Sequence, residues 1–205
     1  MDYQLSFDKT PIALIIFIAT IGFGFYTLLS NQKMLQKMML HPFSLVRNNK
    51  WYQLITSGFV HADLTHLMFN MLSYYFFAFN LEMSIGSLNF LIIYFSALIL
   101  SDISTVIRNK NNPEYYALGA SGAVSAVIFA SILVYPSSKI ALLFIPFGIP
   151  APIFGILYLV YCYYASKRTG DLINHEAHFW GAVSGIVVLI LLIPEILPYF
   201  INSIF

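Results

Sequence analysis

Long uninterrupted apolar runs constrain this chain more than any other feature. Six such runs occur along its 205 residues, at about 11–30, 65–82, 86–107, 120–135, 140–163 and 177–203. A membrane-spanning helix needs roughly 20 mostly apolar residues, because every backbone group in lipid must be hydrogen-bonded internally. Segments of about 10 residues that alternate apolar and polar positions, typical of membrane β-barrels, are not evident. The pattern predicts an all-α membrane protein with six transmembrane helices in a single domain, 1–205.

The fifth run differs from the others because turn-forming residues interrupt it. The stretch FIPFGIPAPIFG carries three prolines and two glycines. Proline cannot continue a helix but is tolerated in a first turn, so we expect this helix to begin near Pro150 or Pro152 and to cover 150–163. The long first loop, 31–64, is too apolar in its second half for a solvated linker. We expect this loop to fold back against the membrane surface.

Composition excludes several classes of function. The chain is 59% hydrophobic and only 9% charged, which is far too apolar for a soluble domain of this size and predicts a multi-pass protein with the lipid bilayer as its partner. The net charge of +1 offers no basic surface for a nucleic acid. A single cysteine, Cys162, supports neither a disulfide framework nor a metal site built from cysteines alone.

Four polar residues are predicted to share one end of the bundle. A chain that crosses six times alternates sides, so the second, fourth and sixth helices all begin on the same side of the membrane. Their first turns contain His66 and Asn70, then Ser121, then His178. Polar residues within spans are rare and are functional candidates. Taken singly, each has an ordinary structural explanation, and only their shared placement favours a site.

These residue types in this arrangement predict nucleophilic catalysis. A serine hydroxyl becomes a nucleophile when a neutral imidazole takes its proton, so Ser121 would attack and His178 would be the base. The sequence GASG turns into a helix at Ser121, which directs the backbone N–H groups of Ala120 and Ser121 toward one small volume. His66 and Asn70 lie four residues apart on one helical face and could add two donors to an oxyanion site.

Small residues predict that the fourth and sixth helices pack closely. The fourth contains Gly122, Ala126 and Ala130, and the sixth contains Gly181 and Gly185, at intervals of four residues. Such faces let helix backbones approach one another. Both series start beside the candidate serine and histidine, so this packing would bring the two side chains together.

The sequence at this point resembles the rhomboid family of intramembrane serine proteases, from about Trp51 to Gly185. The matching motifs are HADLTHLMFN, LEMSIGS, GASG and AHFWGAVSG, in that order. They contain the candidate residues described above and a further set that the resemblance marks as structural residues near the site: His61, Gly119, Gly122, Gly181, Gly185 and Glu82. Each motif is weak alone, and the order on six predicted helices makes the resemblance specific.

The resemblance implies a six-helix rhomboid-like bundle with a Ser121–His178 dyad. Its oxyanion site would use His66, Asn70 and the backbone N–H groups, with no metal and no cofactor. The implied reaction is hydrolysis of peptide bonds in or near transmembrane segments of other membrane proteins. The fifth helix and its flanking loop, around 150–164, would act as a lateral gate for these substrates.

Two positions depart from the family pattern. Many members have arginine after the loop tryptophan, where this chain has Tyr52 after Trp51. Many also have an aromatic residue four positions after the serine, where it stacks on the histidine, and this chain has Ser125 there. A different aromatic residue, or none, would therefore hold His178.

Other functional classes fit the sequence less well. A rhomboid-like binding protein without catalytic activity is the nearest alternative, although such a protein is free to lose the serine and the histidine, and both are present. A metalloprotease would need H-E-x-x-H, whereas the nearest stretch, His175 to His178, has the wrong spacing. An aspartyl protease would need two facing membrane aspartates, and only Asp102 lies within an expected helix. A channel or transporter stays possible. A fluorophosphonate probe that labels the wild type but not Ser121→Ala would distinguish a hydrolase from it.

Location follows from the apolar runs, but orientation does not. We expect the bacterial inner (plasma) membrane. Lysine and arginine number eight on the three loops that precede the site-bearing helices and two on the other side. The positive-inside rule would place these loops in the cytoplasm, whereas the family places its active site outside. We expect the family orientation, and the cation distribution leaves the opposite one open.

Overall fold

The computed structural model describes residues 7–141, 147–167 and 173–204. The described part is mostly helical. Its elements, in chain order, are η1 (Phe7–Lys9), α1 (Pro11–Leu29), α2 (Gln32–Met38), α3 (Pro42–Asn48), α4 (Gln53–Thr56), η2 (Ser57–Phe59), α5 (Leu64–Ile85), α6 (Ser87–Asn109), α7 (Ser121–Val134), β1 (Lys139–Ile140), β2 (Ile149–Pro150), α8 (Ala151–Ala165), α9 (His175–Leu192) and α10 (Ile196–Ile204).

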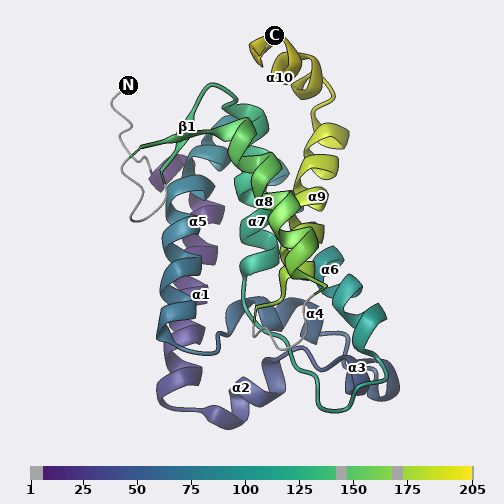
Figure 1. Cartoon of the computed structure of the whole chain (residues 1–205). Helices are drawn as coiled ribbons and strands as arrows, with labels where there is room; N and C mark the ends of the chain where they lie inside the picture. Colours follow the sequence, from purple (N-terminus) through teal and green to yellow (C-terminus); the bar gives the residue numbers. More distant parts are fainter. Residues whose placement is uncertain (1–6, 142–146, 168–172, 205) are drawn as a thin grey trace.

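Helix α7 lies at the centre of the bundle. It contacts α5, α6, α8 and α9, and Figure 1 shows it enclosed by them. Of its 14 residues, 11 are buried. The sequence SGAVSAVIFASILV explains this position, because it is apolar or small on every side, and a helix without a polar face is stable only when it is surrounded. Ser121 therefore begins the most enclosed helix of the molecule.

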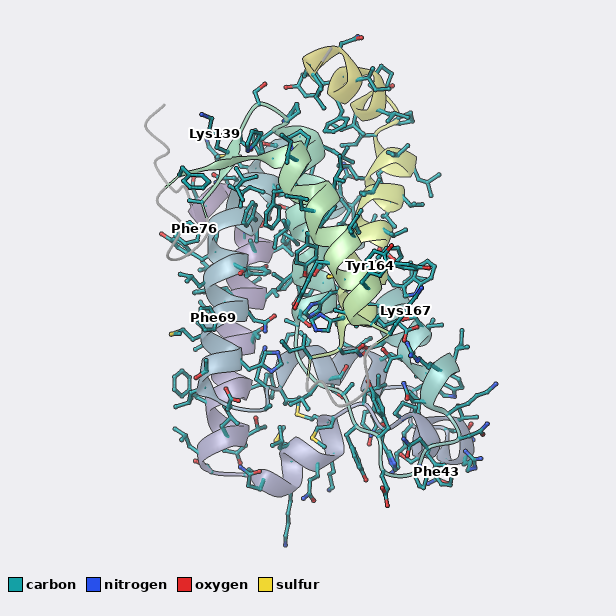
Figure 2. The ribbon with its side chains drawn as sticks, viewed as in Figure 1. Phe43, Phe69, Phe76, Lys139, Tyr164 and Lys167 are labelled. Carbon is teal, nitrogen blue, oxygen red and sulfur yellow. The ribbon has the colours of Figure 1, made fainter. Side chains whose placement is uncertain are left out.

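Several of the predicted membrane helices are supported by length and composition. Within the described residues, α1, α6 and α9 are long and apolar enough to cross a membrane, and α7 and α8 are shorter apolar helices. Large apolar side chains cover the outside of the bundle. Phe69 and Phe76, for example, point outward from α5 and are 46% and 60% exposed (Figure 2). The chain is thus a helical membrane protein, while the count of six spans stays a prediction.

The sixth predicted helix, 177–203, is wrong as a single helix. The structure divides it into α9, which ends at Leu192, and α10, which begins at Ile196. Pro194 is the cause, because proline has no N–H to continue the ladder and disfavours helical geometry in the residue before it. Ile193 accordingly has φ −137° and ψ 80°. The apolar residues on both sides of Pro194 concealed this break in the sequence.

Helix α8 begins at Ala151, close to the expected prolines, and a short hairpin precedes it. Strands β1 and β2 pair in antiparallel fashion, with Lys139 opposite Pro150 and Ile140 opposite Ile149. The sequence does not predict this hairpin, since two-residue strands leave no periodic signal. Arg168, one of the eight cations counted above, lies outside the described residues.

The long first loop folds into three short α-helices and the 3-10 helix η2 beside one end of the bundle, at the bottom of Figure 1. Its apolar residues pack on α6 in a small core that contains Leu40, Leu45, Leu54 and Val106. Tyr52 and Trp51 are half exposed, and the polar anchor is instead the buried Gln53. The Gln53 amide donates to the Lys37 carbonyl and accepts from the His41 N–H, at 3.2 Å each. Contact of this loop with a membrane surface stays a prediction.

Glu82 is not near the candidate site, contrary to the grouping made from sequence. It lies in the last turns of α5, and His66 lies in the first turn, about 24 Å away along the helix at 1.5 Å per residue. Its buried carboxylate accepts the Ile12 and Ala13 N–H groups at 3.1 and 2.6 Å, and the Ser87 hydroxyl at 2.6 Å. Glu82 therefore caps the start of α1, where free N–H groups and the helix dipole favour an anion.

Candidate active site

Ser121 is the first residue of α7, at a tight turn. Gly119, two residues earlier, has φ +117°, a conformation that side-chain-bearing residues rarely adopt. Ala120 is the N-cap and is completely buried. The first N–H groups of a helix have no partner within it. The turn therefore presents the Ser121 hydroxyl and free backbone donors from one short segment.

Helices α7 and α9 are in backbone contact, as the small residues predicted. A Cβ atom placed on Gly181 would lie 2.1 Å from the Gly122 carbonyl oxygen, and one on Gly185 would lie 2.4 Å from that of Ala126. Real Cβ atoms do not come so close, so only glycine fits at both positions. A Cβ on Gly122 would lie 3.5 Å from the Ala177 carbonyl oxygen. The neighbours of Ser121 and His178 in sequence therefore touch across the helix pair.

The start of α9 is fixed by polar contacts that the sequence analysis did not assign. The Asn174 side chain caps α9 by accepting the Ala177 N–H at 3.1 Å, and its amide donates to Thr105 Oγ1 on α6 at 2.9 Å. Glu176 forms an ion pair of 2.9 Å with Arg108 of α6. These contacts hold the first turn of α9, which carries His178. The structure describes no hydrogen bond between the side chains of Ser121 and His178.

His66 reaches the GASG turn from α5. Its ring atoms Cε1 and Nε2 lie 2.7 and 2.9 Å from the position that a Cβ on Gly119 would take. Asn70 is buried one turn further along α5, and its amide donates one hydrogen to the His66 carbonyl at 3.0 Å. An amide has two hydrogens, so one remains for another acceptor. Both predicted oxyanion residues thus lie on the helix whose histidine contacts the turn.

His61 lies in the loop before α5 and supports His66. It is fully buried, and its ring meets the His66 ring edge-on with centroids 5.0 Å apart. Burial, together with the neighbouring His66, lowers the pKa of His61 to about 3. This histidine is therefore neutral at physiological pH, and it limits the space available to the His66 ring without adding a charge.

Tyr158 of α8 occupies the place beside His178 that the Ser125 departure left open. The two rings are nearly parallel, at 18°, with centroids 6.5 Å apart. The Tyr158 hydroxyl is 3.1 Å from the Ser125 hydroxyl, within hydrogen-bonding distance. Sequence reasoning missed this residue because nothing in a tyrosine-rich helix shows which ring faces inward. A serine in place of the expected aromatic residue was the available signal.

Asp102 has a structural role that the sequence did not indicate. Its carboxylate accepts the Ser57 hydroxyl at 2.7 Å, and the Ser57 carbonyl accepts the Gly119 N–H at 2.9 Å. Close by, Leu40 and Ala117 exchange two backbone hydrogen bonds of 2.9 Å. The first loop therefore holds the strand-like approach to the GASG turn, and Asp102 of α6 holds the Ser57 end of that loop.

Two further features are a group of potential metal ligands and a cavity. Cys162, His175 and His178 bring their potential metal-ligand atoms within 4.8 Å of one another. A cavity of about 400 Å³ lies at the opposite end of α7, lined by residues that include Phe76, Ser131 and Tyr135. Because Ser131 and Tyr135 lie at the C-terminal end of α7, the cavity is separate from the GASG turn at its N-terminal end.

Comparison with known proteins identifies the family. Residues 48–195 match the family model of the rhomboid domain. The rhomboid-family protein YdcA of Bacillus subtilis is 39% identical over 79 residues, which are 38% of this chain and 39% of that protein. RHOMBOID-like protein 12, mitochondrial, of Arabidopsis thaliana is 26% identical over 72% of this chain and 49% of its own length. Rhomboid protease GluP of Bacillus subtilis is 31% identical over 47% of this chain and 18% of its own.

The matches cover only part of each of these relatives. The chain spans half or less of the length of these three proteins. The family match, in contrast, includes every candidate residue of the site, from His61 to Gly185. On this evidence, the chain belongs to the rhomboid family.

Proposed function

We propose that this protein is an intramembrane serine endopeptidase with a Ser121–His178 dyad. The observation that carries the proposal is the backbone contact between α7 and α9 at Gly122 and Gly181. A serine and a histidine on different helices can form a hydrogen bond of roughly 2.6–3.2 Å only when their helices approach closely. Family membership, with protease-named relatives such as GluP, supports the same conclusion.

The proposed reaction uses the groups that surround the turn. The Ser121 oxygen attacks the peptide carbonyl while His178 takes the hydroxyl proton, and His178 then returns this proton to the leaving amine. The carbonyl oxygen becomes an oxyanion, for which the N–H groups of Ala120 and Ser121, the Asn70 amide and the His66 ring are the proposed donors. A water molecule would release the acyl group from Ser121 by the same steps. No metal ion or cofactor takes part.

The shortness of α7 supports a site below the membrane surface. Its 14 residues span about 21 Å at 1.5 Å per residue, whereas the hydrocarbon core is about 30 Å thick. A central helix of this length, aligned with its neighbours, has at least one end inside the core. We propose that this end is the Ser121 turn, and that water reaches it from the side covered by the first loop.

The proposed substrates are transmembrane proteins, and α8 is the proposed gate. Only four of its 15 residues are buried, and its outer face bears Ile153, Ile156, Leu157 and Val160, which are about half exposed or more. A helix held this loosely can move aside at little cost in packing. The stretch 150–164 would thus admit a substrate segment from the bilayer. The bacterial plasma membrane is our proposed location.

Cleavage of a model transmembrane substrate in proteoliposomes tests the proposal. Ser121→Ala should abolish cleavage and labelling by a fluorophosphonate probe, while monodispersity in detergent and helix content stay unchanged. Ser125→Ala is the matched control on the same helix and should still be labelled. If the wild type binds transmembrane segments but neither cleaves them nor reacts with the probe, the non-catalytic rhomboid-like binder is the correct alternative.

A further inference from the structure

A second group of reactive side chains lies against the proposed base. It consists of Cys162 on α8 and of His175 and His178 on α9. We propose that these three residues bind a divalent cation of the zinc class, and that this cation inhibits the protease. The inhibitory half of the inference rests on the proposed function, whereas the metal site does not.

The geometry is close to that of a three-ligand metal site. Potential ligand atoms of the three side chains all lie within 4.8 Å of one another. Around a tetrahedral Zn²⁺ with bonds of about 2.0–2.3 Å, sulfur and nitrogen ligands would be about 3.4–3.6 Å apart. A movement of roughly 1 Å shared among three side chains closes this difference, since loosely packed α8 carries one of them. His175 and His178 are three residues apart, so both project from one face of α9.

The donor atoms select the kind of cation. One thiolate and two imidazoles are borderline-soft ligands that suit Zn²⁺ and Co²⁺, whereas Mg²⁺ and Ca²⁺ prefer oxygen. Cys162 and His175 are buried, so an ion bound by them would be largely enclosed. Three protein ligands leave a fourth position for water. On binding, the Cys162 thiol would release its proton to solvent and coordinate as the thiolate.

Inhibition follows from the identity of the third ligand. A ring nitrogen of His178 that donates its lone pair to a metal cannot accept the Ser121 proton. Coordination would also turn the His178 ring away from its near-parallel position against Tyr158. In addition, the ion would join α8 to α9 and so restrain the proposed gate. The sequence predicts no catalytic metal, and this ion is an inhibitor, so chelators should not reduce activity.

The first experiment measures inhibition of the chelator-treated protein by Zn²⁺. We expect the half-inhibitory concentration to rise by about 10-fold or more in Cys162→Ala and in His175→Ala, because even changes to residues around a metal ligand cost 10–100-fold in affinity. Each variant is compared with its own metal-free rate. His41→Ala removes a histidine from the first loop and is the control: it should leave the half-inhibitory concentration of Zn²⁺ unchanged. Mg²⁺ should not inhibit the wild type. Equal inhibition of the wild type and Cys162→Ala would overturn the proposal.

The second experiment detects the site without any cleavage. Co²⁺ added to Ser121→Ala should produce the near-ultraviolet charge-transfer band of a cobalt thiolate, and Zn²⁺ should remove it. The double variant with Cys162→Ala should lack the band. Absence of the band in Ser121→Ala would refute the metal site, whether or not the protein is a protease. A band together with undiminished cleavage in Zn²⁺ would refute the inhibitory role alone.

Discussion

Helices α7 and α8 are similar in length and apolarity but differ in how they are held. Of the 14 residues of α7, 11 are buried, against four of 15 in α8. Helix α7 meets α9 through glycine and backbone atoms, whereas Gly155 of α8 faces the ends of the Phe129 and Ile132 side chains. Backbone contact has a single fitting distance, and flexible side chains tolerate several. The comparison indicates that the molecule combines a closely fitted α7–α9 interface with a neighbouring helix, α8, that is packed more loosely.

Gly181→Leu should have the largest effect, and it tests the backbone contact between α7 and α9. A Cβ atom at Gly181 would lie 2.1 Å from the Gly122 carbonyl oxygen, so α9 must move away. A displacement of even about 1 Å can cost on the order of 10²-fold in rate, and leucine demands more. We expect no measurable cleavage and no fluorophosphonate labelling of Ser121.

Val187→Leu is the matched control on the same helix. Val187 is 48% exposed on the outer face of α9, so a larger side chain there meets no backbone. This variant should cleave at the rate of the wild type. Normal cleavage by Gly181→Leu would show that the α7–α9 contact does not set the distance between the serine and the histidine.

Asn70→Ala should slow the proposed cleavage without abolishing it. Loss of one oxyanion donor typically costs about 10²–10³ in rate. The buried Asn70 amide also bonds its own helix at the His66 carbonyl, so unfolding temperature is measured beside kcat. A large loss of kcat at unchanged stability supports the donor role. A fall in stability that accounts for the lost activity would instead assign Asn70 to helix packing.

The sequence indicated which candidate residues share one end of the bundle, but it did not indicate the long-range contacts that hold them there. Apolar runs and strict alternation of sides placed Ser121, His178 and His66 at one end of the bundle, and small residues predicted the α7–α9 contact. These signals are local or periodic, so a single sequence carries them. The pairing of Ser57 with Asp102 joins residues 45 positions apart and has no such signal. The cap that Glu82 supplies to α1 joins residues about 70 positions apart, so the sequence carries no signal for it either.

The break at Pro194 teaches a different lesson. Its signal was present in the sequence, but continuous hydropathy on both sides suggested one helix through 177–203. Local backbone chemistry therefore takes precedence over hydropathy when the two disagree within a single run. Tyr158 was beyond prediction for a third reason, since the face that a uniformly apolar helix turns inward is decided by packing.

Tyr158→Ala tests the contact between α8 and His178 of α9. Removing the ring leaves His178 without its parallel neighbour, and we expect cleavage to fall by about 2- to 13-fold, equivalent to an aromatic contact of about 0.5–1.5 kcal/mol. Tyr158→Phe keeps the ring and loses the hydroxyl, which contacts Ser125 and Cys162, so cleavage should fall less. In a Ser125→Ala background, Tyr158→Phe should reduce cleavage less than it does in the wild type. Equal losses in Tyr158→Phe and Tyr158→Ala would mean that the hydroxyl, rather than the ring, positions His178.

Gly155→Ala should have the smallest effect. It tests a glycine of α8 in the way that the Gly181 variants test a glycine of α9. A Cβ atom at Gly155 would lie 3.3 Å from Ile132 Cδ1 and 3.4 Å from Phe129 Cε1, which are side-chain atoms of α7. Side-chain ends can give by a few tenths of an ångström, and alanine also favours a helix over glycine by about 1 kcal/mol. We therefore expect cleavage within about 2-fold of the wild type and an equal or higher unfolding temperature, whereas Gly181→Ala, with the same added methyl group, should lose activity. Similar losses in both alanine variants would mean that α8 is held as rigidly as α9, and the proposed gate would then have to lie elsewhere.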